Sequence, residues 1–476
     1  MIFSSILFLI FFLPVVLSIC LLFPKRKSSI LAISSLTFYA VGALEFVPIL
    51  IFTIVISFIG GLWIKRLTEY RNLKLASIIL FLLLPLILYK YVAFFFSNLN
   101  GVFYYLGIES IEVPQYILPI GISFFTFQAI SYVIDVYRSP ELLQSNPIKL
   151  SVYIMFFPQL IAGPIVRYKE FRPYLDSIQI NFAQIGSGSR RFIIGLGKKV
   201  ILADGLKAFC DPIFGNIYDG ISPSIAWLAL LAYALQIYFD FSGYSDMAIG
   251  MGRMFGIRIP ENFNYPYISK SVREFWSRWH ITLSTWFRDY VYYPLGGSHL
   301  GYNRKIINIM VLFLLIGFWH GASWNWIIWG GFYGLMLVLE STILKSFLLK
   351  SSNLIQHLYA LPIIILPFVW TKYTTIHQAV YFYASLLGLR PYDERATEFL
   401  WNLYTPEIGL LLLIGILISV PWPNTFYRIS KMFAIRKNYL TRIRSTSIAL
   451  FQFGILILCI LYLLGGSYNA FFYFQF

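Results

Sequence analysis

Two histidines in apolar surroundings are the residues of this chain best suited to chemistry. His320 follows the run 306–319, which is apolar except for Asn308, and lies in the segment IGFWHGASWNWIIWG. His280 lies forty residues earlier in FWSRWHITLSTWFRD, among three tryptophans: Trp276, Trp279 and Trp286. An ionisable side chain at membrane depth is rare and usually functional. A neutral imidazole can take a proton from a hydroxyl and return it to a leaving group, as a general base does in acyl transfer.

Both histidines also have simpler alternatives. A buried histidine is often only hydrogen-bonded to a neighbour. Asp289, nine residues after His280, could orient an imidazole ring or could instead form an ion pair with the adjacent Arg288. A metal site is a rival use, but spacing of the HExxH type is missing around His280 and His320, so we expect no metal. The other histidines are expected to be structural: His299, His357 and His377.

The composition is that of a polytopic membrane protein. Hydrophobic residues make up 58% and charged residues 12% of the chain, whereas soluble proteins average roughly 45–50% and about 25%. The apolar runs predict an all-α protein with about 11 or more transmembrane helices. No long hydrophilic linker divides the chain, so we expect one integral-membrane domain over residues 1–476. The predicted spans lie near residues 2–23, 29–44, 47–64, 76–95, 115–136, 225–241, 306–319, 325–345, 355–371, 406–421 and 446–465.

The middle third of the chain has a different pattern. Between residues 140 and 300 the apolar stretches become short, and Gly, Pro and charged residues interrupt them. Such segments are typical of re-entrant or interfacial helices, which are tolerated at membrane depth where protein or a water-filled cavity satisfies their backbone. We therefore expect a cavity in this part of the protein.

The basic residues predict an orientation. Lys25, Arg26 and Lys27 follow the first apolar run, so the positive-inside rule places them in the cytoplasm and the N-terminus outside. Six basic residues between Arg428 and Arg444 precede the last span, which places the C-terminus outside as well. Orientation and anionic lipid headgroups account for the net charge of +16, and we expect no nucleic-acid partner.

Five segments together resemble the membrane-bound O-acyltransferase (MBOAT) family. The resemblance extends over nearly the whole chain and is greatest to the bacterial branch typified by the membrane subunit of alginate O-acetylation. The segments are ISFFTFQAISYVIDVYR (122–138), FFPQLIAGPIVRY (156–168), YFDFSGYSDMAIGMGRMFGIRIPENFNYPY (238–267), REFWSRWHITLSTWFRDYVYYPLGG (273–297) and GFWHGASWNWIIWG (317–330).

The resemblance implies a fold and a reaction. The fold would be a ring of transmembrane helices with re-entrant and interfacial helices around a thinned centre. The reaction would be O-acylation, with acetyl as the expected group and acetyl-CoA or another acyl thioester as donor, without a bound cofactor. His320 matches the family's catalytic histidine, and His280 matches a second implicated one. Side chains that could line the funnel or contact substrate are Trp276, Trp279, Arg288, Asp289, Trp319 and Asn325.

The resemblance also implies a location and partners. The chain would lie in the inner membrane of a bacterium. Similar systems work with an extracytoplasmic SGNH-type acyltransferase, which modifies an extracellular glycan. If the tail FFYFQF lies outside, Tyr473 could enter the outer funnel and carry the acyl group, or it could simply belong to an interfacial aromatic belt. Basic residues that could attract the anionic donor, or that could only set the orientation, are Arg190, Arg191, Lys198 and Lys199.

A second function class stays open at this point. A transporter or flippase for a glycan or a lipid-linked substrate could use the two histidines as a proton relay. The pattern also leaves the acceptor open among alginate and other exopolysaccharides, peptidoglycan, and teichoic acid, for which the acyl group would be D-alanine.

Overall fold

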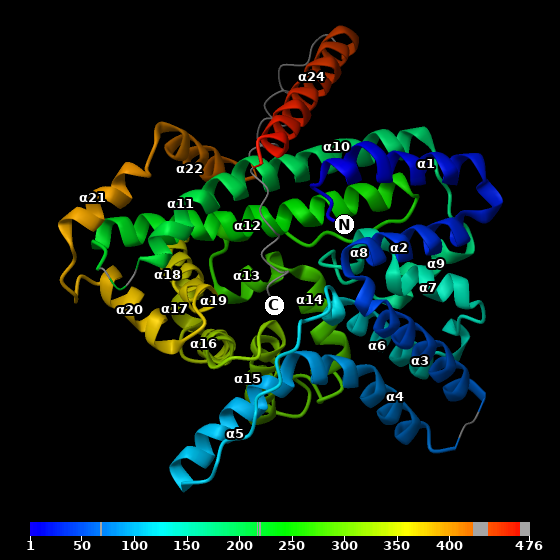
Figure 1. The fold of residues 1–476 in the computed structure, drawn as a ribbon, viewed down its shortest axis with the longest axis horizontal. Coiled ribbons are helices and arrows are strands. Elements are labelled where there is room, and N and C mark those ends of the chain that lie inside the picture. Colours follow the sequence, from blue (N-terminus) through cyan, green and yellow to red (C-terminus); the bar gives the residue numbers. More distant parts are fainter. Residues whose placement is uncertain (67–68, 217, 219, 422–436, 467–476) are drawn as a thin grey trace.

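The regular structure of the protein is helical throughout the described residues. The computed structural model describes residues 1–66, 69–216, 218, 220–421 and 437–466, and every regular element within them is a helix (Figure 1). This confirms the all-α prediction. In these ranges six helices are long and apolar enough to cross a membrane, or seven if one bent pair is a single span. The six are Pro24–Arg66, Arg71–Leu106, Pro223–Met254, Tyr302–His320, Asn353–Lys372 and Thr446–Leu464.

The N-terminal helices form one side of the molecule. The predicted spans near 29–44 and 47–64 are α2 and α3, which follow each other with only one short turn of helix between them. In Figure 1, α5 projects away from the body of the protein. The elements are η1 (Leu7–Phe12), α1 (Leu13–Leu22), α2 (Lys27–Ala43), α3 (Val47–Arg66), α4 (Arg71–Leu86), η4 (Ile87–Tyr91) and α5 (Val92–Leu106).

Helix α6 differs from the predicted span near 115–136. It runs from Ile122 to Arg138, and its residues from Ile122 to Val136 are all buried. Protein rather than lipid therefore surrounds this helix. The elements after it are short, as the interrupted pattern of the middle third predicts: α7 (Pro147–Met155), α8 (Phe157–Leu160) and α9 (Tyr168–Asp176).

The longest described helix lies against an antiparallel partner. Helix α12 (Pro223–Met254) pairs with the continuous helix formed by α10 (Phe182–Gly197), η6 (Lys198–Ala203) and α11 (Asp204–Gly215). The two backbones approach closely at Gly195 and Gly243, where a Cβ on Gly195 would lie 2.5 Å from the Gly243 carbonyl oxygen. The predicted span 225–241 is shorter than α12. Polar residues in the second half of α12 are buried against α10 and do not end the helix.

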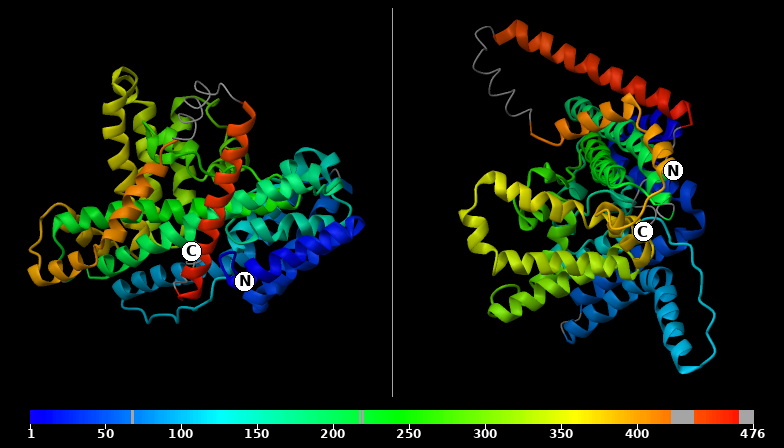
Figure 2. Two further views of the ribbon diagram at one scale, coloured as in Figure 1. Left: turned by 90° about the horizontal axis from the view of Figure 1, so that it is seen from above. Right: turned by 90° about the vertical axis from the view of Figure 1, so that its left-hand side faces the viewer.

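Short helices occupy the middle of the molecule in Figure 1, where α13 (Val272–Arg278) and α14 (Ile281–Phe287) lie below α12 and above α15 (Tyr302–His320). Helix α16 (Trp324–Ser341) returns alongside α15. The views in Figure 2 show the same packing of helices around this central region.

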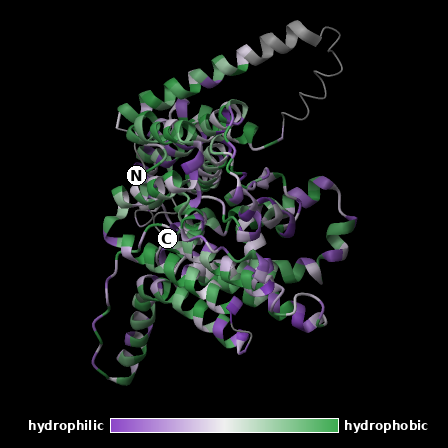
Figure 3. Ribbon diagram, turned by 90° about the vertical axis from the view of Figure 1, so that its right-hand side faces the viewer, coloured by the Kyte–Doolittle hydropathy of each residue, from purple (hydrophilic) through white to green (hydrophobic). Residues whose placement is uncertain are grey.

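The C-terminal helices complete the periphery. Helix α24 contacts α10 and η6 and otherwise lies on the outside, and Figure 3 shows hydrophobic residues along such peripheral helices. The bent pair α21 and α22 meets at 73°. The elements are α17 (Lys345–Lys350), α18 (Asn353–Ile365), α19 (Phe368–Lys372), α20 (Ile376–Leu386), α21 (Glu394–Asn402), α22 (Pro406–Ile418) and α24 (Lys437–Leu464).

Candidate active site

His320 is the last residue of α15 and is buried among indole rings. Its ring stacks on Trp326 at a centroid distance of 5.1 Å and an interplanar angle of 17°, and it meets Trp329 edge-on at 5.2 Å. The turn after His320 makes this stacking possible, because a Cβ on Gly321 would lie 2.1 Å from the Trp326 ring. The sequence GASW therefore folds α16 back so that its first turn covers the histidine.

His280 lies between α13 and α14 and is fully buried. Its backbone is left-handed, with φ of 46°, which costs a non-glycine residue roughly 1–2 kcal/mol and often occurs at functional sites. Burial lowers the pKa of His280 to about 3, so the ring is neutral near pH 7. The Trp319 ring lies 6.4 Å from the His280 ring and 4.7 Å from the His320 ring, so one indole contacts both histidines.

Asn262 holds the His280 side in place. Its Oδ1 lies 3.3 Å from His280 Nδ1 and accepts a hydrogen bond of 2.8 Å from the Thr282 hydroxyl. The same hydroxyl accepts from the Ile165 backbone N–H at 3.0 Å, which fixes the segment after α8. Sequence reasoning missed Asn262 and Thr282. The available signals were their places in PENFNYPY and WHITLS, two of the recognisable segments.

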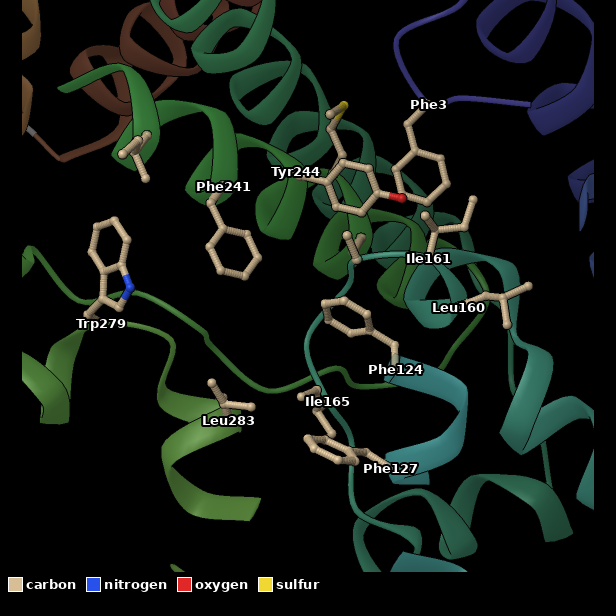
Figure 4. Close-up of a cluster of buried hydrophobic side chains, with 14 of the residues drawn as sticks. Phe3, Phe124, Phe127, Leu160, Ile161, Ile165, Phe241, Tyr244, Trp279 and Leu283 are labelled. Atoms are coloured by element: carbon tan, nitrogen blue, oxygen red, sulfur yellow. The ribbon is translucent and has the colours of Figure 1, made fainter. Parts of the chain in front are cut away.

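The tryptophans near His280 in the sequence form a wider aromatic layer. Trp276 meets Trp329 edge-on at 5.6 Å, while Trp286 stacks on Phe127 at 4.0 Å and donates to its carbonyl oxygen. Figure 4 shows a neighbouring part of the buried cluster, to which Phe127, Phe241 and Trp279 contribute from different segments. The two histidines therefore lie within one continuous aromatic core.

A polar cavity of about 530 Å³ reaches the residue that covers His320. Ser323 and Trp326 line it on the α16 side, so the Trp326 indole has the cavity on one side and stacks on His320. Gln236 also lines the cavity, and its buried Oε1 has no hydrogen-bond partner among the described residues. The cavity is thus a polar chamber adjacent to the histidine.

Paired charges line the rest of the cavity. Lys199 Nζ lies 2.6 Å from an Asp204 carboxylate oxygen and 2.8 Å from one of Asp240. Burial raises the pKa of Asp204 to about 7, although the Lys199 ammonium acts in the opposite direction. Lys207 and Lys372 both pair with a third aspartate, Asp211. Three lysines therefore pair with three aspartates along this wall.

The cavity lies toward one end of the α12 pair. Phe214 and Tyr218 line it, and Cys210 on the same helix contacts Ala229 near the start of α12. The opposite end of the pair lies beside the basic residues of the N-terminus, since Lys27 Nζ donates to the Ile178 carbonyl oxygen at 2.9 Å, just before α10 begins. The cavity and the Lys25 to Lys27 cluster therefore lie at opposite ends of this helix pair.

Asp289 is the centre of an ion cluster. Its carboxylate pairs with Arg167 and Arg288, and Lys169 lies 3.6 Å away. Burial would raise the pKa of Asp289, but the hydrogen bond from Arg288 and the charge of Arg167 outweigh burial and lower it. Arg138 also donates to the Asp289 carbonyl oxygen at 2.9 Å. The structure thus places Asp289 among cations from three segments, the end of α6, the start of α9 and the residues after α14.

The other predicted site residues have structural contacts. Asn325 is buried and donates to the Tyr373 carbonyl oxygen at 2.6 Å, and Trp279 stacks on Phe275. Of the four basic residues predicted at a donor entrance, three pair with carboxylates: Arg191 and Lys198 with Asp246, and Lys199 as described above. Tyr473, the predicted acyl carrier, lies outside the described residues, as does much of the basic segment between Arg428 and Arg444. No group of three His, Cys, Asp or Glu side chains in the described ranges could hold a metal ion.

The sequence of this site matches a family of enzymes. Residues 122–386 match the model of the membrane-bound O-acyltransferase family, and that segment contains His280, His320, Asn262 and all residues that line the cavity. The chain belongs to the membrane-bound O-acyltransferase family. It is therefore an O-acyltransferase and a multi-pass membrane protein, which confirms the resemblance seen in the sequence.

Individual MBOAT relatives agree with this assignment. The chain is 35% identical to a probable alginate O-acetylase of Azotobacter vinelandii, over 90% of this chain and 86% of the relative. It is 32% identical to a peptidoglycan O-acetyltransferase of Helicobacter pylori, over 96% and 92%. A teichoic acid D-alanyltransferase of Bacillus subtilis is also 32% identical, over 46% of this chain and 58% of the relative.

Proposed function

We propose that this MBOAT enzyme O-acetylates an extracellular polysaccharide, using a thioester donor from the cytoplasm and His320 as the general base. The observation that carries the proposal is the position of His320, whose ring stacks on Trp326, and Trp326 lines the polar cavity. The similarity to the alginate and peptidoglycan O-acetyltransferases supports acetyl as the group and a glycan as the final acceptor.

The distribution of charge supports an outward-facing cavity. The positive-inside rule assigns Lys25, Arg26 and Lys27 to the cytoplasm, and Lys27 contacts the end of the helix pair that is remote from the cavity. Arg304 and Lys305 similarly begin α15, while His320 ends it. An acceptor would then enter from outside, and the acetyl thioester would approach from the cytoplasm, in a bacterial inner membrane.

The chemistry needs a base that returns its proton. A His320 ring nitrogen takes the proton of the acceptor hydroxyl as the oxygen forms a bond to the thioester carbonyl carbon. The tetrahedral intermediate then collapses, the C–S bond breaks, and the thiolate takes the proton from the imidazolium. The products are an acetyl ester and a free thiol, and His320 is neutral again. His280 contributes through the shared Trp319 ring and through Asn262, which hold the aromatic core around the reacting groups.

The immediate acceptor would be a carrier of the acetyl group. An SGNH-type acyltransferase on the outer face would then pass the group to the glycan. Tyr473 is the candidate carrier on this chain, because the last span ends nearby and a phenol oxygen can form an ester. Replacing Tyr473 with Phe removes only that oxygen, so full acetylation by Tyr473→Phe would exclude this step.

The proposal is tested by the ester content of the cell's glycans. Mild base releases ester-linked acetate from extracellular polymers of strains with and without the protein, and fractionation before release identifies the polymer. We expect one glycan to lose its acetate when the protein is absent. Equal acetate on every glycan in both strains would contradict the proposal.

A further inference from the structure

Lys90 is a single charge in the middle of a long apolar segment. Between residues 75 and 106 every other residue is uncharged, and the segment belongs to the span Arg71–Leu106. Lys90 lies in the π-helical turn η4, which separates α4 from α5. Turns of this kind are rare and often occur at functional sites, and a charged side chain inside a span usually has a function.

The side chain of Lys90 reaches the end of α15. Its Nζ donates a hydrogen bond of 2.5 Å to the Trp319 carbonyl oxygen and lies 5.8 Å from the Trp319 ring centroid. Trp319 is the residue immediately before His320, so Lys90 contacts the neighbour of the histidine. The side chain is partly exposed, and no carboxylate in the described part of the chain forms an ion pair with it. The hydrogen bond that the structure gives Lys90 therefore goes to a backbone carbonyl and not to a carboxylate.

The negative end of a helix dipole stabilises this cation. The last carbonyl groups of α15 carry partial negative charge, and Lys90 uses one N–H bond on the Trp319 carbonyl. Its remaining N–H bonds stay available to a ligand. A second donor lies close by, because the buried Trp319 Nε1 has no hydrogen-bond partner in the described ranges. Both donors belong to the immediate surroundings of His320.

We propose that Lys90 stabilises the negative charge that develops on the thioester carbonyl oxygen when the acceptor attacks. This inference rests on the proposed acetyl transfer. When the acceptor oxygen bonds to the carbonyl carbon, the C=O electron pair moves onto its oxygen, and the Lys90 ammonium donates a hydrogen bond to it. The carbonyl re-forms as the C–S bond breaks, and Lys90 neither gains nor loses a proton. Such preorganised charge is often the largest contribution to catalysis.

The chain offers a closely matched control for this role. Lys74 lies in the same span, and its Nζ also donates to a backbone carbonyl, that of Glu69, and also lies 5.8 Å from a tryptophan ring, Trp63. Lys74 differs in lying at the other end of α4, far along the chain from η4. Replacement of each lysine by Met therefore removes a hydrogen bond to a backbone carbonyl and a contact with a tryptophan ring, but only Lys90 contacts the residue next to His320.

The test compares initial rates of ester-linked acetate formation on the extracellular glycan after induction. Four variants are compared with wild type: Lys90→Met, Lys90→Arg, Lys74→Met and His320→Ala. Each rate is divided by the amount of the variant in the membrane. Thermal unfolding of the purified variant in detergent shows that this protein is folded. We expect Lys90→Met to lower the rate about 100-fold, as the loss of an oxyanion donor does. Lys90→Arg keeps the charge and should retain at least about a tenth of the rate, and Lys74→Met should stay within about twofold of wild type.

Two results would overturn the role of Lys90. One is a Lys90→Met rate within about threefold of wild type, and the other is an equal loss in Lys90→Arg and Lys90→Met, since charge would then not matter. Failure of the proposed function gives a different result, because His320→Ala would then keep its rate. If Lys90→Met does not fold, Lys90→Gln takes its place in the same comparison.

Discussion

The contact between α15 and α16 sets the position of His320. The two helices touch at Gly317 and Gly330, where each Cα lies 3.0 Å from the position that a Cβ on the other residue would take. A Cβ on Gly330 would also lie 2.3 Å from the Phe313 carbonyl oxygen. Gly317 is less than one turn from His320, so any separation of these helices moves the histidine relative to Trp326.

The replacement Gly330→Ala should therefore damage activity. Ordinary contact begins at 3.4 Å, so the helices must separate by about 1 Å to admit the methyl group. Overpacking of this kind destabilises the folded protein by roughly 1–3 kcal/mol. The better helix propensity of Ala returns at most about 1 kcal/mol. A displacement of about 1 Å at a catalytic group lowers the rate by roughly 100-fold. The acetate assay should show a loss of this order.

Gly331→Ala is the matched control, because the adjacent residue of the same helix has room for a methyl group. A Cβ there would lie 3.5 Å from a Leu314 methyl carbon, an ordinary contact. We expect Gly331→Ala to keep the wild-type rate and to have a thermal midpoint equal to or above that of wild type, because Ala has the better helix propensity. Equal rates for Gly330→Ala and Gly331→Ala, at equal amounts of folded protein, would refute the argument that this helix contact positions His320.

Three further predictions concern the surroundings of the site. Trp326→Ala removes the ring between His320 and the cavity, so water from the cavity should reach the histidine. In membrane vesicles supplied with acetyl-CoA we therefore expect more free acetate for each ester formed. Replacement of the exposed Trp324 by Ala should not change this ratio. Asp289→Asn should lower the thermal midpoint near pH 7. Because the folded-state pKa of Asp289 is lowered, its stabilisation is lost as pH falls below its usual value of 3.8, and the two midpoints should converge there; a constant difference would argue against this ion cluster. Glu340 accepts hydrogen bonds from the backbone N–H groups of Val272 and Arg273, the first residues of α13, at 2.6 and 2.9 Å. Glu340→Gln should therefore lower the free energy of unfolding by about 1–3 kcal/mol. Wild-type stability of this variant would show that these hydrogen bonds are unimportant.

Much of the architecture could be predicted from local patterns. Apolar runs correctly indicate helices such as α3 and α15, since the length of an uncharged apolar run can be read directly from the sequence. The same rule failed for the second half of α12 and for the start of α6. The second half of α12 is covered by protein, so its polar residues are buried inside the molecule and do not mark a helix end. The start predicted near 115 was wrong for another reason, because the apolar residues before Ile122 form no helix.

The site was only partly predictable for a related reason. The two histidines stand out because ionisable residues are rare in apolar segments, and Lys90 could have been found by the same signal. Its partner Trp319 could not, because 229 residues separate the two in the sequence. The contact of Asn262 with Thr282 and His280, and the paired charges of the cavity, likewise depend on tertiary packing.

The most direct test of the account is the rate of glycan acetylation when His320 alone is replaced. Cells that carry wild-type protein, His320→Ala or His299→Ala are compared at equal membrane levels, with His299 as the control because it is exposed in a loop away from the aromatic core. The account predicts that His320→Ala abolishes ester-linked acetate on the glycan while His299→Ala leaves it unchanged. Wild-type acetate in His320→Ala would contradict the assignment of His320 as the general base.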